Sequence, residues 1–203
     1  MSNDSKSSTN TRRDFIKKST ILVAGSTVAG NLQIARAAHA YGDEVIKIGL
    51  VGCGGRGTGA AVQAMNTNGD VHLVAMADVF EDRLQASFRA IKSKHGDKVK
   101  VTPDTMFVGL DAYKQVMESD ADLIILATPP GFRPLHFEAG VNAGKHVFME
   151  KPVATDAPGV RRVLDANKIA KEKNLCVQVG LQRRHEEAYI ETMKHLHDGA
   201  IGD

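Results

Sequence analysis

The feature that most constrains this chain is a glycine-rich turn that directly follows a strand-like run. The apolar run Ile46–Val51 leads into Gly52, Gly54 and Gly57, which have the spacing G-x-G-x-x-G. In such a turn the first glycine allows a tight bend, the second lets the backbone approach a pyrophosphate, and the third lets the next helix pack close to the strand. The pyrophosphate would lie at the amino end of that helix, where N–H groups and the helix dipole favour an anion. The pattern predicts a dinucleotide-binding unit.

An acidic residue follows at the position that such a unit requires. Val71–Ala77 is a second strand-like run, and it ends at Asp78, 26 residues after Gly52. A carboxylate there can accept hydrogen bonds from the 2′- and 3′-hydroxyls of the adenosine ribose, and it would repel the 2′-phosphate of NADP. We therefore predict NAD as the cofactor. The alternative is an aspartate that caps the next helix, expected to begin at Val79.

The first 40 residues have the pattern of an export signal. Thr11–Lys17 contains an Arg pair followed after one residue by Phe, an aliphatic residue and Lys, and it resembles the twin-arginine motif. The apolar stretch Ile21–Ala29 comes next, and Ala38–Ala40 has the small-x-small pattern of a cleavage site. This stretch is too short and too polar for the roughly 20 apolar residues of a membrane span. We expect residues 1–40 to be a signal peptide recognised by the twin-arginine translocase, and the protein to be periplasmic.

The charge balance, the cysteines and the histidines give no sign of a nucleic-acid partner or a metal site. Residues 1–40 hold six of the 26 Lys and Arg and two of the 24 Asp and Glu, which leaves 20 basic and 22 acidic residues, a formal charge of −2. No nucleic-acid partner is therefore indicated. Cys53 and Cys176 are expected to be buried thiols. No metal site is expected, since His195 and His197, two residues apart on a helix, point to different faces.

Beyond residue 44, strand-like and helix-like segments alternate, which is typical of a parallel sheet covered on both faces. The clearest buried strand is 122–127, because its apolar run is continuous. We predict an α/β fold, a Rossmann doubly wound parallel sheet, over residues 44–180. The expected strands are 46–51, 71–77, 98–102, 122–127, 145–149 and 175–180. The first expected helix follows the glycine turn and ends at Met65, and the others are 79–94, 111–118, 133–142, 157–173 and 186–197.

Several motifs taken together resemble the glucose-fructose oxidoreductase / inositol dehydrogenase family, often written Gfo/Idh/MocA. The resemblance covers residues 44–203, and a Glu-Lys-Pro triplet at the end of a strand is its most specific element. The matching elements are Gly52-Cys53-Gly54-Gly55-Arg56-Gly57, Asp78, Thr128-Pro129 with His136 seven residues after Pro129, Glu150-Lys151-Pro152, and Gly180-Leu181-Gln182-Arg183-Arg184.

The resemblance implies a second domain after the Rossmann domain. In the family an α/β domain with a large open sheet supplies much of the substrate site and often the oligomer interface. Residues 181–203 would be the start of that domain in truncated form, so we expect the chain to be a fragment or the product of a shortened gene. The family's second catalytic motif, an Asp and a His a few residues apart, has no counterpart here. A substrate pocket needs two walls, and the missing part of that domain would supply the second wall. The full-length form is expected to be a homo-oligomer.

The resemblance places the ammonium of Lys151 near the nicotinamide and the substrate hydroxyl. This position is at the carboxyl ends of the strands, where α/β sheets bind ligands. A desolvated lysine can accept a hydroxyl proton while hydride leaves the same carbon for NAD. Glu150 is expected to bind the cofactor or to orient Lys151. The alternative is a strand-ending turn with a solvated lysine.

Other site residues follow from the resemblance or from their place in the chain. His136 is expected beside the nicotinamide half of the cofactor, with a surface histidine as the alternative. Arg56 could reach the pyrophosphate, and Arg183 or Arg184 could contact substrate oxygens; a solvated arginine is the alternative for each. The predicted cofactor-binding residues are Gly52, Gly54, Gly55, Arg56, Gly57, Asp78, Thr128, Pro129, His136, Glu150, Lys151 and Gln182.

The function predicted from the sequence is that of an NAD-dependent oxidoreductase acting on a hydroxyl of a sugar, a sugar derivative or a polyol. Two alternatives stay open. One is an NAD-dependent redox glycosidase similar to certain α-N-acetylgalactosaminidases, whose glycine loops also contain Gly-Arg, as at Gly55-Arg56. The other is a non-catalytic nucleotide-binding remnant.

Overall fold

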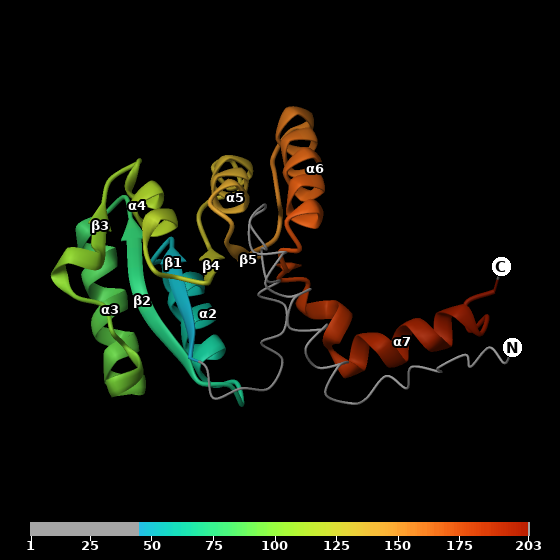
Figure 1. The fold of residues 1–203 in the computed structure, drawn as a ribbon. Helices are drawn as coiled ribbons and strands as arrows, with labels where there is room; N and C mark the ends of the chain where they lie inside the picture. Colours follow the sequence, from blue (N-terminus) through green and yellow to red (C-terminus); the bar gives the residue numbers. More distant parts are fainter. Residues whose placement is uncertain (1–44, 203) are drawn as a thin grey trace, which may run out of the picture. The chain divides into compact units, whose positions relative to one another are not determined.

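The computed structural model describes residues 45–202, which belong to the compact unit formed by residues 41–203. The predicted signal peptide lies outside the described residues. The described part is built on a six-stranded sheet with the strand order β3-β2-β1-β4-β5-β6, and every neighbouring pair is parallel (Figure 1). This order is that of the Rossmann fold, so the predicted fold class is confirmed.

The helices and strands lie close to the predicted ranges. The strands are β1 (Ile46–Val51), β2 (Val71–Asp78), β3 (Met106–Val108), β4 (Leu123–Leu126), β5 (His146–Met149) and β6 (Val177–Val179). The α-helices are α2 (Gly55–Met65), α3 (Glu81–His95), α4 (Ala112–Glu118), α5 (Arg133–Asn142), α6 (Ala157–Glu172) and α7 (Glu187–His197). Short 3-10 turns are η2 (Gly96–Lys98), η3 (Pro103–Thr105) and η4 (Gln182–His185).

The prediction for the third strand was wrong in position. Within 98–102 only Val99 pairs with the sheet, through an isolated bridge to Leu73. The turn η3 then begins at Pro103, and a capping box between Thr102 and Thr105 stabilises it. A proline also has no N–H to donate to a sheet. The chain becomes a strand only at Met106–Val108, which pairs with the end of β2.

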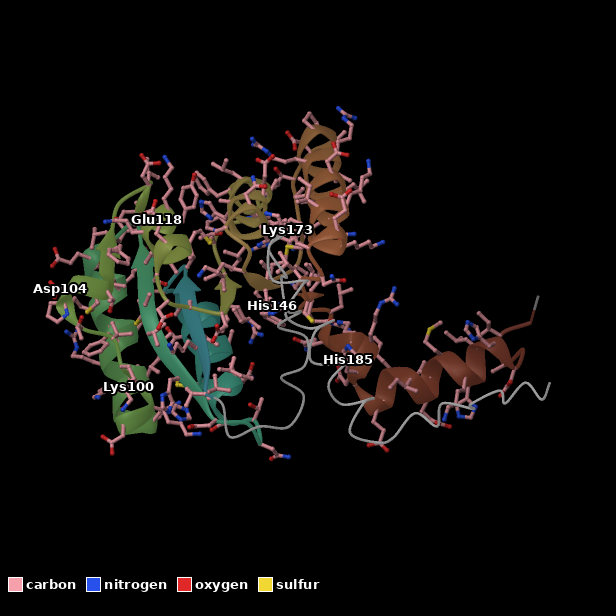
Figure 2. All side chains as sticks on the ribbon, viewed as in Figure 1. Lys100, Asp104, Glu118, His146, Lys173 and His185 are labelled. Carbon is pink, nitrogen blue, oxygen red and sulfur yellow. The ribbon has the colours of Figure 1, made fainter. Side chains whose placement is uncertain are left out.

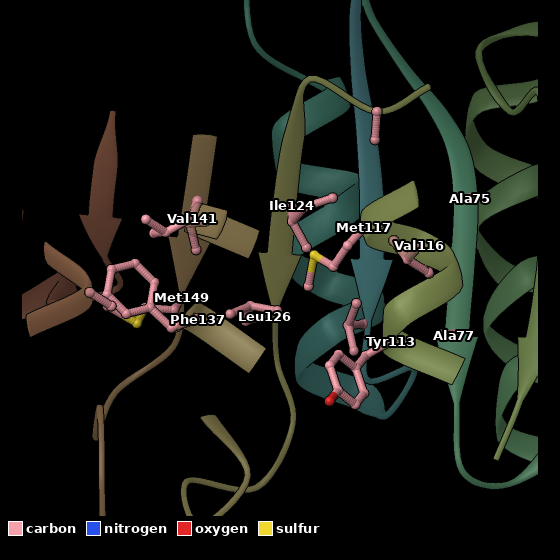
Figure 3. Close-up of a cluster of buried hydrophobic side chains, with 14 of the residues drawn as sticks. Ala75, Ala77, Tyr113, Val116, Met117, Ile124, Leu126, Phe137, Val141 and Met149 are labelled. Atoms are coloured by element: carbon pink, nitrogen blue, oxygen red, sulfur yellow. The ribbon is translucent and has the colours of Figure 1, made fainter. Parts of the chain in front are cut away.

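Helices cover both faces of the sheet, and this explains the continuous apolar strands. Helices α4, α5 and α6 pack on one face over the cluster of buried side chains in Figure 3, and α2 and α3 pack on the other. Strand β4 divides its side chains between the two cores, because successive residues point to opposite faces. Ile124 and Leu126 belong to the first cluster, and Ile125 belongs to the second.

Helix α7 contributes to neither core. Its described side chains include none that is buried, and Tyr189, Ile190 and Met193 are 40%, 45% and 45% exposed. Figure 2 shows side chains standing out around the whole of this helix. The helix therefore has apolar side chains that the rest of residues 45–202 leaves uncovered.

The two cysteines differ in environment. Cys53 is buried, and its thiol donates to the carbonyl of Ala77 at 3.4 Å. Cys176 is exposed, so the prediction of two buried thiols was wrong for this residue. It lies just before β6, the strand at the edge of the sheet, where burial is incomplete.

Candidate functional site

The candidate residues gather at one edge of the sheet, because the carboxyl ends of parallel strands meet there. Gly52 follows β1 and has a φ of +96°, and a Cβ at this position would lie 2.8 Å from the carbonyl carbon of Ala127 and the nitrogen of Thr128. The loop after β1 thus touches the loop after β4. These two strands are neighbours at the point where the strand order reverses, which is where doubly wound sheets bind ligands.

The glycine turn brings the amino end of α2 close to β1. A Cβ on Gly57 would lie 1.8 Å from the carbonyl oxygen of Gly52, so only glycine fits there. By contrast, a Cβ on Gly54 or Gly55 would meet no atom within 4 Å. The first helical hydrogen bond runs from Thr58 N–H to the carbonyl of Gly54 at 2.9 Å, so the N–H groups of residues 55–57 precede it. This open, donor-rich backbone fits a pyrophosphate.

Asp78 ties the end of β2 to the glycine turn. Its Oδ2 accepts from the N–H of Cys53 at 2.6 Å, and its Oδ1 accepts from the N–H of Phe80 at 2.9 Å. It does not cap α3, whose N-cap residue is Phe80, so the capping alternative is wrong. A carboxylate has about four acceptor positions, which leaves further positions for ribose hydroxyls. Burial, and then the charge of Asp78, raises the pKa of the Cys53 thiol, which is therefore neutral.

Glu150 and Lys151 follow β5 directly. Glu150 is buried, and its backbone N–H donates to the carbonyl of Leu126 at 3.0 Å. Its carboxylate fills the space beside Gly180, where a Cβ would lie 3.0 Å from both carboxylate oxygens. The side chain of Lys151 is exposed, and the peptide bond to Pro152 is cis. The motif therefore joins a buried carboxylate to an exposed ammonium.

An ion pair connects α2 with the end of β5. Oε1 of Glu150 lies 2.7 Å from Nε and 2.6 Å from Nη2 of Arg56, and Nη1 of Arg56 donates to Gln63 at 3.4 Å. Arg56 is therefore paired with a carboxylate while still exposed to solvent, and its contact with a pyrophosphate stays a prediction. The side chain of Arg56 is half exposed and partly screened by water, whereas Glu150 is buried and has Arg56 as its cationic partner.

His136, near the start of α5, is buried rather than on the surface. Its ring is 6% exposed, lies 4.2 Å from the ring of Tyr113, and has Nδ1 3.2 Å from Oγ1 of Thr128. Burial, and secondarily the charge of Arg133, lowers the pKa of this imidazole to about 4. The surface alternative is thus wrong. The neutral ring contacts the side chain of Thr128 and so stabilises the loop after β4. Contact with a cofactor stays a prediction.

Arg133 is a buried residue of the site that the sequence did not predict. This side chain is 3% exposed, and its Nη1 and Nη2 donate to the carbonyls of Pro152 and Thr128. Arg133 lies on the face of α5 that also carries the buried residues Phe137 and Val141, four and eight positions further on. This helical spacing is the signal that could have revealed it.

The residues of η4 lie apart from these contacts. Gln182, Arg183 and Arg184 are exposed, and the guanidinium of Arg183 lies 4.6 Å from the ring centroid of Tyr189 on α7. A cation above an aromatic face is an attractive arrangement, so α7 is the neighbour that holds Arg183. Binding of cofactor by Gln182 and of substrate by the two arginines stays a prediction.

Residues 45–202 contain no group of three or more His, Cys, Asp and Glu side chains arranged to bind a metal ion. None of the helices in this range combines the length and the apolar character needed to cross a membrane.

The lowered pKa of His136 predicts that stability depends on pH. The folded chain keeps the imidazole neutral down to about pH 4, whereas the unfolded chain protonates it near the ordinary value of 6.5. The unfolded chain thus binds more protons between these values, so the free energy of unfolding falls as the pH is lowered through this window. We expect this group to account for a loss of about 2 kcal/mol between pH 7 and pH 4.5.

The measurement is urea unfolding at both pH values for the unmutated chain and for His136→Gln, which cannot be protonated. The variant should lose less stability on acidification. His197→Gln, an exposed position on α7, is the matched control and should behave like the unmutated chain. An equal pH dependence in the His136 variant would contradict the prediction.

Comparison with known proteins adds independent evidence. The family model GFO_IDH_MocA, described as an oxidoreductase family with an NAD-binding Rossmann fold, matches residues 46–181. Inositol 2-dehydrogenase of Rhizobium meliloti is 31% identical over 158 residues, which are 78% of this chain and 42% of that protein. Inositol 2-dehydrogenase of Salmonella typhimurium is 28% identical over 159 residues, 77% of this chain and 43% of that protein.

Solved structures give the same result. Scyllo-inositol dehydrogenase of Lactobacillus casei, with bound NAD(H) and scyllo-inositol, matches with a TM-score of 0.59 and 26% identity, over 79% of this chain and 43% of that one. Myo-inositol 2-dehydrogenase of Lactobacillus plantarum matches with a TM-score of 0.62 and 26% identity, with the same coverage. The chain thus spans less than half the length of these relatives. The chain belongs to the Gfo/Idh/MocA family of oxidoreductases and carries its NAD-binding Rossmann fold.

Proposed function

We propose that this chain is the cofactor-binding part of an NAD-dependent dehydrogenase that oxidises a hydroxyl of a sugar, a sugar derivative or a polyol. The observation that carries the proposal is the convergence of the glycine turn, Asp78 and Glu150-Lys151 at one edge of the sheet, around the point where the strand order reverses. Relatives that are inositol dehydrogenases support a polyol or sugar as the substrate class.

The cofactor would lie along this edge. The N–H groups at the start of α2 would bind the pyrophosphate, and Arg56, half exposed in the first turn of that helix, would add its positive charge while paired with Glu150. The free acceptor positions of Asp78 would bind the adenosine ribose. Thr128, Pro129, His136 and Gln182 would lie toward the nicotinamide half. NAD, when bound, supplies the acceptor for a hydride.

Lys151 would carry the proton chemistry. In its neutral form the amine can accept the hydroxyl proton while the hydride leaves the same carbon, so proton and hydride depart to different acceptors. Glu150, fixed by Arg56 and packed beside Gly180, holds the backbone from which Lys151 extends. Arg183 and Arg184 carry a fixed positive charge that suits substrate oxygens.

Asp78 should decide the choice between NAD and NADP. The negative charge of Asp78 should repel a 2′-phosphate, so the chain should bind NAD at least about tenfold more tightly, a difference of about 1.4 kcal/mol. Asp78→Ala should remove most of this preference. Asp78→Asn, which keeps an oxygen acceptor but no charge, should do so with less disturbance of the contact to Cys53.

Calorimetric titration of all three proteins with both nucleotides is the measurement. Asp82→Asn, an exposed carboxylate on α3, is the matched control and should leave the ratio of affinities unchanged. Equal affinity of the unmutated chain for NAD and NADP would show that Asp78 does not select the cofactor.

Turnover should need more of the protein than this chain contains. A chain that spans less than half of its relatives should bind NAD but oxidise no sugar or polyol by itself, because hydride transfer needs the substrate held roughly 3 to 3.5 Å from its acceptor. The whole protein should turn over. In it, Lys151→Ala should lower the rate by something on the order of 10² to 10⁴, the usual effect of losing a positioned acid or base. Lys151→Arg keeps the charge but accepts no proton, and it should be equally impaired.

The assay is NADH formation with a panel of sugars and inositols. Lys168→Ala, which removes an exposed lysine of α6, is the control and should retain full activity. Release of a coloured aglycone is followed in parallel, since glycosidase activity without net NADH would favour the redox glycosidase instead. Strong turnover by the 203-residue chain would place the substrate site elsewhere.

We also propose export by the twin-arginine translocase to the periplasm. The motif at Thr11–Lys17 and the short apolar stretch after it support this route. Replacing Arg12 and Arg13 with lysine should abolish export, which cell fractionation would show. Arg36→Lys leaves the pair intact and should be exported normally. Undiminished export of the double variant would contradict the proposal.

Finally, we propose that the whole protein is a homo-oligomer. The exposed apolar side chains Tyr189, Ile190 and Met193 support association, because such surfaces are usually covered in soluble proteins. Size-exclusion chromatography with light scattering should give a mass above that of one chain, and replacing all three residues with serine should lower it. A monomeric mass for the unmutated whole protein would refute the proposal.

A further inference from the structure

We propose that Arg133 is a positioning residue for Lys151, an inference that rests on the proposed function. It sets the distance between the two loops that flank the nicotinamide end of the candidate site. The loop after β4 carries Thr128, and the loop after β5 carries Lys151 and Pro152. Arg133, in the first turn of α5, touches both.

The two contacts place one planar group between two strand ends. Nη2 donates to the carbonyl of Thr128, five residues before Arg133 in the chain, and Nη1 donates to the carbonyl of Pro152, 19 residues after it. A guanidinium holds its donors in a rigid fork, so the two carbonyls cannot move apart without losing one contact. The carbonyl of Pro152 belongs to the residue next to Lys151, and the fork therefore fixes the backbone from which the lysine extends.

The burial of Arg133 argues against a passive role. The side chain is 3% exposed, its pKa is lowered by burial, and its Nε has no hydrogen-bond partner within the described residues. Taking a guanidinium out of water is costly, and neutral carbonyls compensate only part of the cost. An apolar side chain of similar length would avoid this cost, but it would leave the carbonyls of Thr128 and Pro152 without these donors. The guanidinium therefore acts through its two directed hydrogen bonds.

Neighbouring groups make the arrangement stiff. His136, one turn further along α5, contacts the side chain of Thr128 while Arg133 holds its carbonyl, so the first turns of α5 grip this residue at two points. Glu150 acts on Arg133 through its negative charge, which favours the cationic form. The same carboxylate is bound by Arg56. Arg133 thus completes a chain of charges from α2, through the end of β5, to α5.

The position of Arg133 predicts different effects of its loss on the two halves of the cofactor. Residues that bind the adenosine half, such as Asp78 and the glycine turn, make no contact with Arg133 in the described part of the chain. Loss of the fork should therefore disturb the nicotinamide end much more than the adenosine end. ADP-ribose lacks the nicotinamide and serves as the probe for the adenosine half.

The experiment is calorimetric titration of the 203-residue chain with NAD and with ADP-ribose. Arg133→Met should weaken NAD binding by about tenfold, comparable to one lost hydrogen bond to a charged group, and change ADP-ribose binding less than about twofold. Arg133→Lys reaches one carbonyl at a time and should be intermediate. Arg162→Met, which removes an exposed arginine paired with Glu138 on the same side of the sheet, is the control and should change neither affinity.

A double-mutant cycle tests whether Arg133 acts through the lysine loop. In a Lys151→Ala background, Arg133→Met should have a much smaller effect on NAD binding, since the group it positions is gone. Circular dichroism checks that each variant folds. If Arg133→Met does not fold, Arg133→Lys provides the test, through its ratio of affinities for NAD and ADP-ribose. Equal weakening of both ligands, no change in either, or strict additivity in the cycle would overturn the role of Arg133. An unmutated chain that binds neither ligand would instead contradict the proposed function.

Discussion

The close contact between Gly57 and Gly52 is the constraint on which the rest of the site depends. A Cβ at Gly57 would lie 1.8 Å from the carbonyl oxygen of Gly52, so α2 can approach β1 only because no side chain intervenes. The approach directs the amino end of α2 toward the loops after β1 and β4. It also brings Arg56, in the first turn of that helix, within reach of the buried carboxylate of Glu150. A larger residue at position 57 would therefore disturb both the glycine turn, which is proposed to bind the pyrophosphate, and the end of β5.

Around this contact, polar side chains hold the loops at the carboxyl ends of the strands through hydrogen bonds. The strand ends leave backbone groups that need partners, because no further strand residue follows to pair them. Asp78 accepts from two N–H groups, and Arg133 donates to two carbonyls. The neutral ring of His136 fits among them without adding another charge. The loops are thus held by directional bonds, which fix their positions more narrowly than apolar contact would.

The sequence predicted the fold well and the individual contacts poorly, for a physical reason. The glycine spacing and the apolar runs are local signals, and they identified β1, α2 and the β4 strand almost to the residue. The third strand was misplaced because Val99 and Val101 have strand-like side chains, but Pro103 ends the run before it can pair. The Arg56–Glu150 pair joins residues 94 positions apart, and no local pattern reports such a distance. The burial of Arg133 could have been predicted, because it lies on the same helix face as Phe137 and Val141. A charged residue at a helix start is, however, ordinarily assigned to the surface.

The two hydrogen bonds of Asp78 have a thermodynamic consequence. Because backbone N–H groups of the glycine turn and of the α3 entry hold both carboxylate oxygens, the side chain has lost its rotational freedom when the domain folds. A ribose that reaches this carboxylate meets an acceptor already oriented, so little conformational entropy remains to be lost on association. The conformational entropy of the Asp78 side chain is therefore lost on folding and not on binding. Selectivity at this position can then be sharp even if only a few contacts are made, since a rigid charge cannot turn away from a phosphate that arrives in place of a hydroxyl.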